Sequence, residues 1–258
     1  MGSSLSTVIR DLGRRRGRER RGLTLAEGVR LVEEAIAADV PIRGAVVSPG
    51  LEATPRGAAL KTLLEARGVR VEPVSDRELD ALAGTEHPQG IVAVIEPRQW
   101  VLGDIRAGAG APVVVLDGVQ DPGNVGTILR TTLGLGGAGL IVLPGTAELT
   151  NPKVVRGSMG ALFRLPAVPV TTAEFMAWAG ASGVSLWASD AGAAPVTRRD
   201  ASSAVPIALI FGNEGAGVSD ALLAAAARRV AIALAPGAES LNVAVAAGIL
   251  LYEVTRGS

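Results

Sequence analysis

Apolar residues recur along the chain with two different spacings, and the alternation between them predicts an α/β protein. Spacings of three and four residues predict helices, whereas short apolar runs bounded by Gly or Pro predict strands. The first part of the chain is an Arg-rich segment at 1–20 and then an α/β pattern at 21–97, with predicted helices at 24–38, 55–67 and 76–83 and predicted strands at 45–47, 69–74 and 91–95. A following stretch rich in Gly, Ala and Pro, residues 98–111, predicts a linker.

Strands and helices alternate more regularly in the second part of the chain, residues 112–258. The predicted strands cover 112–116, 139–143, 167–170, 185–188, 206–211 and 229–233, and the predicted helices cover 124–135, 153–163, 173–181, 219–228 and 241–255. Such alternation predicts a parallel sheet with helices on both faces. Ligands of these sheets bind at the carboxyl ends of the strands, so we expect the functional residues in the loops there.

Composition and charge narrow the class of protein only slightly. Hydrophobic residues make up 48% of the chain and charged residues 19%, which is typical of a folded globular protein. The sequence has no Cys, no signal-peptide pattern at its start and no apolar run near the ~20 residues that span a bilayer. We therefore expect a cytoplasmic protein without disulfides, thiolate metal sites or membrane association.

The net charge is zero, but arginines cluster near the start of the chain. A guanidinium offers a fixed fork of donors that suits phosphate, so this cluster predicts an RNA-binding segment. The alternative is a solvated helix face. The candidate RNA-binding residues are Arg14, Arg15, Arg16, Arg18, Arg20 and Arg21.

The loop after the first strand of the second part leads into a helix that contains a charged residue. Asn124 is a candidate cap for that helix, and Arg130 lies six residues further on in an otherwise apolar stretch. An Arg in that setting needs an anionic or polar partner. The alternative reading of Arg130 is a structural ion pair.

Two later loops also follow predicted strands. The loop Gly212-Asn213-Glu214-Gly215-Ala216-Gly217 lets the backbone approach a ligand and places the Glu214 carboxylate at a strand end. The loop after residue 232 leads to the last helix, for which Ser240 is the candidate N-cap. The apolar stripe on that helix, predicted to face the core, consists of Leu241, Val245, Ile249 and Tyr252.

In this order, the three loops resemble the signature motifs of the TrmH (SpoU) family of RNA 2′-O-ribose methyltransferases, in the SPOUT superfamily. The matching segments are Asn-x5-Arg at 124–130, Phe-Gly-Asn-Glu-Gly-x-Gly at 211–217 and Glu-Ser-Leu-Asn-Val-x-Val-Ala at 239–246. Residues 151–161 resemble the middle helix of the family, and residues 20–95, including His87-Pro88-Gln89-Gly90, resemble its L30e-like RNA-binding domain more loosely. Ala244 stands where many relatives carry a second Ser.

The resemblance implies a homodimeric α/β catalytic domain with a deep C-terminal trefoil knot, S-adenosylmethionine as methyl donor and no metal. By position, Gly212, Ile232 and Leu241 match the donor contacts, with Leu143 and Ala188 as weaker candidates. The residues that match the family's catalytic and substrate-positioning positions are Asn124, Arg130, Glu214, Ser240 and Asn242.

The roles of these residues follow from the resemblance and from side-chain chemistry. Because a guanidinium stays protonated, we expect Arg130 to bind the adjacent phosphate and orient the 2′-hydroxyl rather than to act as a base. Asn124 and Glu214 are expected to fix Arg130, while Ser240 and Asn242 shape the pocket. The favoured substrate is 23S rRNA, because an L30e-like domain with an Arg-rich lead is more typical of relatives that modify it.

Several alternatives stay open. A tRNA substrate, a role in antibiotic resistance, or a non-catalytic RNA-binding protein on the same fold are compatible with the motifs. Residues 134–139 also fit the Gly-x-Gly-x-x-Gly pattern of dinucleotide-binding enzymes. That pattern requires a strand before it and a helix after it. Here a predicted helix precedes it and a predicted strand follows, so we predict a helix-to-strand turn.

Overall fold

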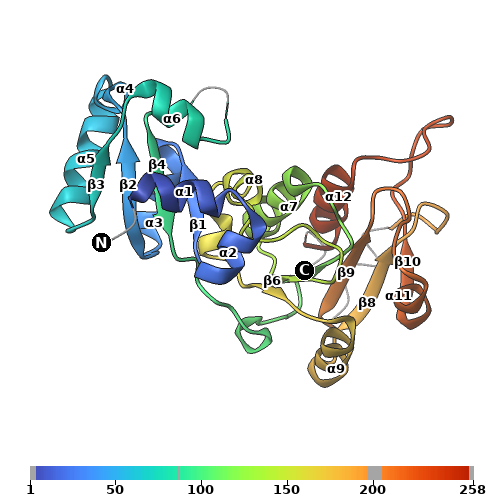
Figure 1. Ribbon diagram of the computed structural model, residues 1–258. Helices are drawn as coiled ribbons and strands as arrows, with labels where there is room; N and C mark the ends of the chain where they lie inside the picture. The colour runs from blue at the N-terminus through green and yellow to red at the C-terminus, as the bar shows by residue number, and fades with distance from the viewer. Residues whose placement is uncertain (1–3, 86–87, 197–204, 256–258) are drawn as a thin grey trace. The chain divides into compact units, whose positions relative to one another are not determined.

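The computed structural model describes residues 4–85, 88–196 and 205–255, which divide into two compact units (Figure 1). Unit 1 contains the chain up to Arg98 together with 150–163, and unit 2 contains 99–149 and the chain from Arg164 onward. His87, part of the expected L30e-like motif, lies outside the described residues. Within the described ranges no helix is long and apolar enough to cross a membrane.

Unit 1 is built on a four-stranded sheet with the order β1-β4-β2-β3, in which β4 runs antiparallel to β1 and β2 and β3 is parallel to β2. Its elements are α1 (Leu5–Leu12), α2 (Arg15–Arg21), β1 (Thr24–Glu27), α3 (Val29–Ala37), β2 (Ile42–Val47), α4 (Pro49–Glu52), α5 (Pro55–Ala66), β3 (Val71–Pro73), α6 (Asp76–Leu82), β4 (Ile91–Ile95), α8 (Pro152–Gly157) and the 3-10 helix η2 (Ala161–Phe163).

Side chains of the central strands alternate between the two faces of this sheet. Val92 and Val94 of β4 share one apolar cluster with Val46 of β2 and with residues of α1 and α6. Helices α3 and α5 contact the sheet through their own buried side chains. Leu5, Ile9 and Leu12 are buried in the same cluster as Val92 and Val94. Helix α1 therefore belongs to the core of unit 1, although the sequence pattern places residues 1–20 in a separate segment.

The predicted helix at 24–38 is wrong in its first turn. Residues 24–27 form β1, paired with β4, and α3 begins only at Val29. Gly28 has φ 90°, a left-handed value that a helix cannot contain and that other residues rarely adopt. The apolar periodicity continues through both elements, which explains why the strand was hidden in it.

Residues 150–163 pack within unit 1, although the sequence pattern places them in the second half of the chain. Glu27, whose side chain is 5% exposed, accepts from Arg156 Nη1 at 2.9 Å and from Gly84 N at 2.9 Å. Thr24 Oγ1 also donates to the carbonyl of Thr150. The buried carboxylate is therefore paired and hydrogen-bonded, as burial of a charge requires.

Unit 2 has a six-stranded, all-parallel sheet with the order β10-β8-β9-β5-β6-β7. Its elements are η1 (Leu102–Asp104), β5 (Val113–Asp117), α7 (Pro122–Gly134), β6 (Gly139–Val142), β7 (Ala167–Pro169), α9 (Thr172–Ser182), β8 (Ser185–Ser189), β9 (Ile207–Gly212), α11 (Asp220–Ala225), β10 (Arg228–Val230) and α12 (Val243–Thr255). The expected mixed α/β class with a parallel sheet is confirmed, and residues 134–139 form the predicted helix-to-strand turn between α7 and β6.

The two faces of the parallel sheet are covered by different helices. Side chains of α9 and α11 pack with one set of strand residues in a single apolar cluster, whereas α7 and α12 contact each other and the sheet. Ile105 is buried in the apolar cluster that contains α9 and α11, so part of the predicted linker at 98–111 is packed within unit 2.

The apolar stripe on the last helix does not face the core as predicted. Leu241, Val245, Ile249 and Tyr252 are 39%, 51%, 37% and 44% exposed, and Leu133 on α7 is 37% exposed. The buried side of α12 is formed instead by residues of its other face: Ala244, Ala247, Leu250, Leu251 and Val254. Because α12 is apolar nearly all round, its sequence does not distinguish the covered side from the open one.

Candidate functional site

Two loops at the carboxyl edge of the parallel sheet are joined by the side chain of Asn213. Strands β5 and β9 are neighbours with Asp117 opposite Gly212, so the loops that follow them start side by side. Asn213 Nδ2 donates to the carbonyl of Gly118 at 2.9 Å, and its Oδ1 accepts from Gly215 N at 2.9 Å and Ala216 N at 3.0 Å. This stapling role was missed among the predicted site residues, although Asn followed by Gly two residues later is typical of such turns.

Glu214 ties the same two loops together through its carboxylate. Oε1 accepts from Asn124 Nδ2 at 3.1 Å and from Asp121 N at 3.3 Å, and Oε2 accepts from Gln120 N at 3.2 Å. Burial acts to raise the pKa of this carboxyl, but hydrogen bonds from its own amide, Asn124, Gln120 and Asp121 outweigh burial and lower the pKa. Glu214 is therefore held as an anion at neutral pH.

Asn242 links the third loop to this arrangement. Its Nδ2 donates to Asn124 Oδ1 at 2.9 Å, while its Oδ1 accepts from Ala244 N at 2.9 Å and Val245 N at 3.3 Å. We call the three connected side chains of Asn124, Glu214 and Asn242 the amide–carboxylate chain. It brings together residues that are 90 and 118 positions apart in sequence.

Both predicted helix caps at these loops differ from the structure. Asn242, not Ser240, accepts the first free amides of α12. Asp121, not Asn124, caps α7, since Asp121 Oδ1 accepts from Asn124 N at 2.8 Å. The Asn124 side chain is thereby left for the amide–carboxylate chain. Asn151 caps α8, because its Oδ1 accepts from Lys153 N at 2.9 Å.

Arg130 lies on α7 but is not fixed by Asn124 and Glu214, which bond to each other instead. Six residues of helix separate Arg130 from Asn124 by about 9 Å along the axis and turn it to a different side. The Arg130 side chain is exposed, and it makes no hydrogen bond or ion pair with the described part of the chain. Arg130 therefore does not form the structural ion pair considered from the sequence within the described residues. The N–H groups of its guanidinium are open to an external anion.

The five predicted donor-contact residues fall into two groups. Leu143 and Ala188 are buried in the core of unit 2 at 2% and 0% exposure, so their side chains offer no surface to a ligand. Gly212 ends β9, while Ile232 and Leu241 bound the loop before α12 and keep part of their surface exposed.

The loop between Ile232 and Leu241 leaves much of its backbone open for hydrogen bonds with a ligand. Within it, one backbone hydrogen bond runs from Ala238 N to the carbonyl of Ala235, and most other N–H and C=O groups of this described stretch are open. Open backbone groups flanked by apolar side chains suit adenine recognition. By contrast, the described residues contain no group of three or more His, Cys, Asp or Glu that could hold a metal ion.

The Arg-rich segment, considered within unit 1, is more structural than its sequence indicates. Arg18 is 5% exposed, and its Nη1 donates to the carbonyls of Leu12 at 3.0 Å and Gly13 at 3.3 Å. Its predicted RNA contact is therefore corrected: this guanidinium holds the end of α1. The exposed candidates are Arg14, Arg15, Arg16, Arg20 and Arg21, of which Arg15 pairs with Glu19 and both Arg20 and Arg21 pair with Asp11.

The lowered pKa of Glu214 predicts a pH-dependent contribution to stability. A carboxyl whose pKa is lower in the folded state stabilises the fold above its unfolded pKa and loses that contribution as the pH falls. Urea unfolding of the wild type and Glu214→Gln should therefore differ near neutrality and converge as the pH falls below the ordinary Glu pKa of 4.5 and through the lowered pKa of Glu214. Glu253→Gln is the matched control on the same unit. A difference from Glu214→Gln that stays constant with pH would contradict the assignment.

Comparisons of sequence and of structure both find RNA methyltransferases over most of the chain. Residues 111–252 match the SpoU rRNA Methylase family, and residues 25–101 match the family described as RNA 2′-O ribose methyltransferase substrate binding. The 23S rRNA (guanosine(2553)-2′-O)-methyltransferase of Bacillus subtilis is 35% identical over 89% of this chain and 87% of its own length. The 23S rRNA (uridine(2479)-2′-O)-methyltransferase of Streptomyces viridochromogenes is 34% identical over 95% of this chain and 86% of its own.

A solved structure agrees with these sequence relatives. The AdoMet-bound rRNA methyltransferase of Sinorhizobium meliloti superposes with a TM-score of 0.86 at 32% identity, covering 98% of this chain and 95% of that one. The match to the SpoU family extends over more than half of the sequence and includes all three loops of the amide–carboxylate chain. The chain therefore belongs to the SpoU rRNA Methylase family.

Proposed function

We propose that this protein transfers a methyl group from S-adenosylmethionine to a ribose 2′-hydroxyl of 23S rRNA. The observation that carries the proposal is the amide–carboxylate chain, which joins the three family loops at the carboxyl edge of the parallel sheet. That edge is where ligands of parallel α/β sheets bind. The names of the curated relatives support rRNA over the tRNA alternative.

The donor supplies an already activated sulfonium methyl group, so the protein has mainly to align the acceptor oxygen and favour loss of its proton. Gly212 and the loop from Ile232 to Leu241 would hold the donor through backbone groups. Arg130 would bind the phosphate next to the acceptor ribose and orient the 2′-hydroxyl. Its exposed guanidinium, without a partner in the described residues, supports this role.

The amide–carboxylate chain would act indirectly, by positioning the loops that bind the donor and the acceptor. Glu214 and Asn242 fix Asn124, and the three together set the distance between the loops that surround the donor and acceptor. We assign them as positioning residues, with Ser240 as an exposed contact beside them. The presence of Arg130, Glu214 and Asn242 also favours an enzyme over a non-catalytic RNA-binding protein.

The finer features follow from the family. We propose a trefoil knot in residues 112–258, an RNA-binding role for residues 21–97 with the exposed arginines of the Arg-rich segment, and a cytoplasmic location, where ribosomal RNA is found. Their support is the match to the family's substrate-binding domain and to the SpoU structures.

We further propose a homodimer formed through the exposed apolar stripe. Val245, Ile249 and Tyr252 on α12 leave an apolar surface open to solvent, and Leu133 on α7 is a further exposed apolar residue. Contiguous apolar surface of this kind is rare on monomers and marks interfaces.

Placing a carboxylate in this stripe should break the dimer, because burying an unpaired charge is costly. We expect Ile249→Asp to sediment with the 26.1 kDa mass of one chain and the wild type with twice that mass. Leu63→Asp, at an apolar residue of unit 1 that is also 41% exposed, is the control. A wild type that sediments as a single chain would overturn the proposed dimer.

The activity itself is tested with methyl-labelled donor and RNA that contains both rRNA and tRNA, with the rRNA either free of protein or assembled in ribosomes. Incorporation into 23S rRNA, mapped to one 2′-O-methylated nucleotide, is the expected result. Incorporation only into tRNA would replace the substrate assignment, and S-adenosylhomocysteine binding without incorporation into any RNA would contradict the proposed reaction.

A further inference from the structure

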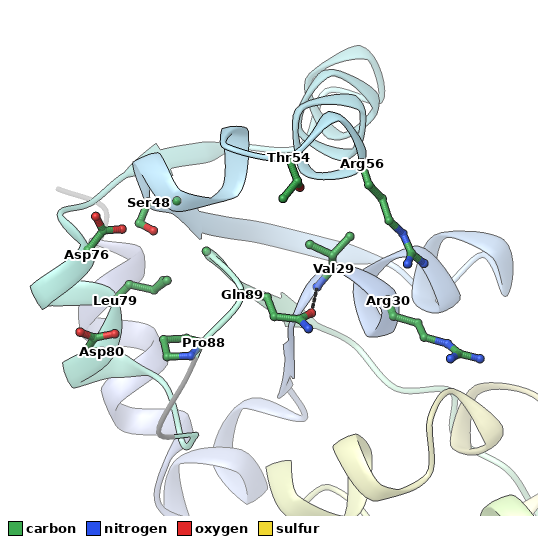
Figure 2. Close-up of a pocket in the computed structure, with 12 residues that line it drawn as sticks. Val29, Arg30, Ser48, Thr54, Arg56, Asp76, Leu79, Asp80, Pro88 and Gln89 are labelled. Carbon is green, nitrogen blue, oxygen red and sulfur yellow. Dashed lines mark hydrogen bonds between the residues drawn. The ribbon is translucent and has the colours of Figure 1, made fainter.

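A cavity in unit 1 carries different chemistry on its two sides. It has a volume of about 520 Å³, within the usual range for small-molecule sites, and it is bounded by residues of α3, α5, α6 and the segment 88–90. Figure 2 shows Asp76 and Asp80 on one side and Arg30 and Arg56 on the other.

The first side presents hydrogen-bond acceptors. Ser48 is 3% exposed, yet its hydroxyl caps no helix amide and makes no hydrogen bond with the described residues; it faces the cavity in Figure 2. The hydroxyl is open to the cavity, so it is available to hydrogen-bond with a ligand there. A Cβ placed on Gly50 would lie 3.4 Å from Asp76 Oδ1 and 3.6 Å from Ser48 Oγ, so these two oxygens flank one point in space.

The second side presents guanidinium groups. Arg56 is held by Glu33, with its Nε 2.9 Å from Oε1 and 3.1 Å from Oε2. Arg30 is exposed on the first turn of α3 and forms no ion pair or hydrogen bond with the described part of the chain. A free guanidinium beside a cavity suits a phosphate group.

The surface between the two sides is partly apolar. Val29 and Pro88 line it, whereas Leu79 is 1% exposed and adds little surface. The Gln89 side chain is fixed because its Oε1 accepts from Val29 N at 3.1 Å. An apolar surface between acceptors and a cation suits the flat face of a nucleobase. Figure 2 shows Gln89 and Val29 between the aspartates and the arginines, with Leu79 on the side of the aspartates.

We propose that this cavity binds one unpaired guanosine nucleotide of the substrate RNA. Guanine carries an N1–H and an exocyclic N2 amino group on its Watson–Crick edge, which match the acceptors Ser48, Asp76 and Asp80. Uracil offers a single N–H flanked by two carbonyls, which the carboxylates would repel. The nucleotide's phosphate then meets Arg30. This inference rests on the proposed function, because it names the RNA feature that the enzyme selects.

The test measures binding of fluorescent pentanucleotides to the full chain at one fixed salt concentration. We expect UUGUU to bind at least about tenfold more tightly than UUUUU, the discrimination of one good base contact, with the inosine analogue in between. Asp76→Asn combined with Asp80→Asn should remove the preference for guanosine, and Ser48→Ala should reduce it. Arg30→Gln should weaken both oligonucleotides by the same factor.

The matched controls are Glu65→Gln in the last turn of α5 and Arg67→Gln at its C-cap, both outside the cavity lining, and they should bind as the wild type does. Thermal unfolding checks that each variant is folded. Equal affinity for guanosine and uridine, or a preference that survives the double Asp variant, would overturn the inference. Binding of free GMP without preference for the guanosine pentanucleotide would also overturn it, since the site would then serve a free nucleotide.

Methyl transfer measured on the same proteins separates this inference from the proposed function. The cavity variants should raise KM for RNA and leave kcat unchanged, because they change residues of unit 1 and the predicted catalytic residues belong to unit 2. Methyl transfer without guanosine preference refutes the cavity assignment alone. Guanosine preference without methyl transfer refutes the proposed reaction alone.

Discussion

Replacement of Arg130 by alanine is expected to lower kcat for RNA methylation by at least about a hundredfold, the usual cost of losing a positioned charged donor at a reacting group. The fold should be preserved, because Arg130 is exposed and makes no hydrogen bond or ion pair with the described residues. The expected result is therefore an enzyme of wild-type melting temperature with nearly abolished turnover.

The measurement is single-turnover methyl transfer with saturating donor and RNA, alongside S-adenosylhomocysteine binding. Arg106→Ala, an exposed arginine of the same unit, should keep near-normal turnover. Arg130→Lys should recover only part of the rate, since an ammonium lacks the planar fork of a guanidinium. Turnover of Arg130→Ala within a few-fold of wild type, with RNA binding intact, would remove Arg130 from the reaction.

The second large effect is expected from Gly212→Ala at the end of β9. A Cβ at this position would lie 2.0 Å from Gly217 C, 2.1 Å from Val218 N and 2.2 Å from Gly217 O. All three are backbone atoms of the loop that Asn213 and Glu214 hold in place, so no side chain can move to relieve the overlap. We expect a loss of about 3 kcal/mol or more in the free energy of unfolding, at the upper end for overpacking.

Donor binding should fall with stability, because the displaced loop is the one proposed to contact the donor. Thermal unfolding and calorimetric titration with S-adenosylhomocysteine measure the two effects. Gly180→Ala is the control: it lies within α9, its Cβ would meet nothing within 4 Å, and alanine favours the helix. A Gly212→Ala protein with wild-type stability and donor affinity would show that the close approach is not required.

Much of the element order follows from the sequence because local spacing reports secondary structure directly. Strand β4 has the predicted bounds at 91–95, and the parallel sheet follows from apolar runs separated by helices. The three site loops were also found from the sequence, since glycines and polar residues directly after buried strands point to the ligand edge of such a sheet.

Long-range contacts decided what the loop residues do. The sequence places Asn124, Glu214 and Asn242 in separate loops, whereas the fold turns them into one hydrogen-bonded chain. The predicted caps were wrong because each loop contains more than one side chain that can cap the following helix. Asp121 caps α7, and Asn124 bonds instead to Glu214, which is 90 residues away. Asn242 takes the place of Ser240 at α12.

Exposure, too, was decided by tertiary structure. The stripe through Val245 and Ile249 is apolar and regularly spaced, yet it faces solvent, while Arg18 in an arginine-rich run is buried on the carbonyls of α1. Periodicity gives the side of a helix on which a residue lies, but only the packing of the whole chain determines which side is covered. The sequence alone determined the family, the order of elements in residues 112–258 and the loops of the site. The tertiary structure decided which of their side chains meet, because those contacts depend on strand neighbours distant in sequence.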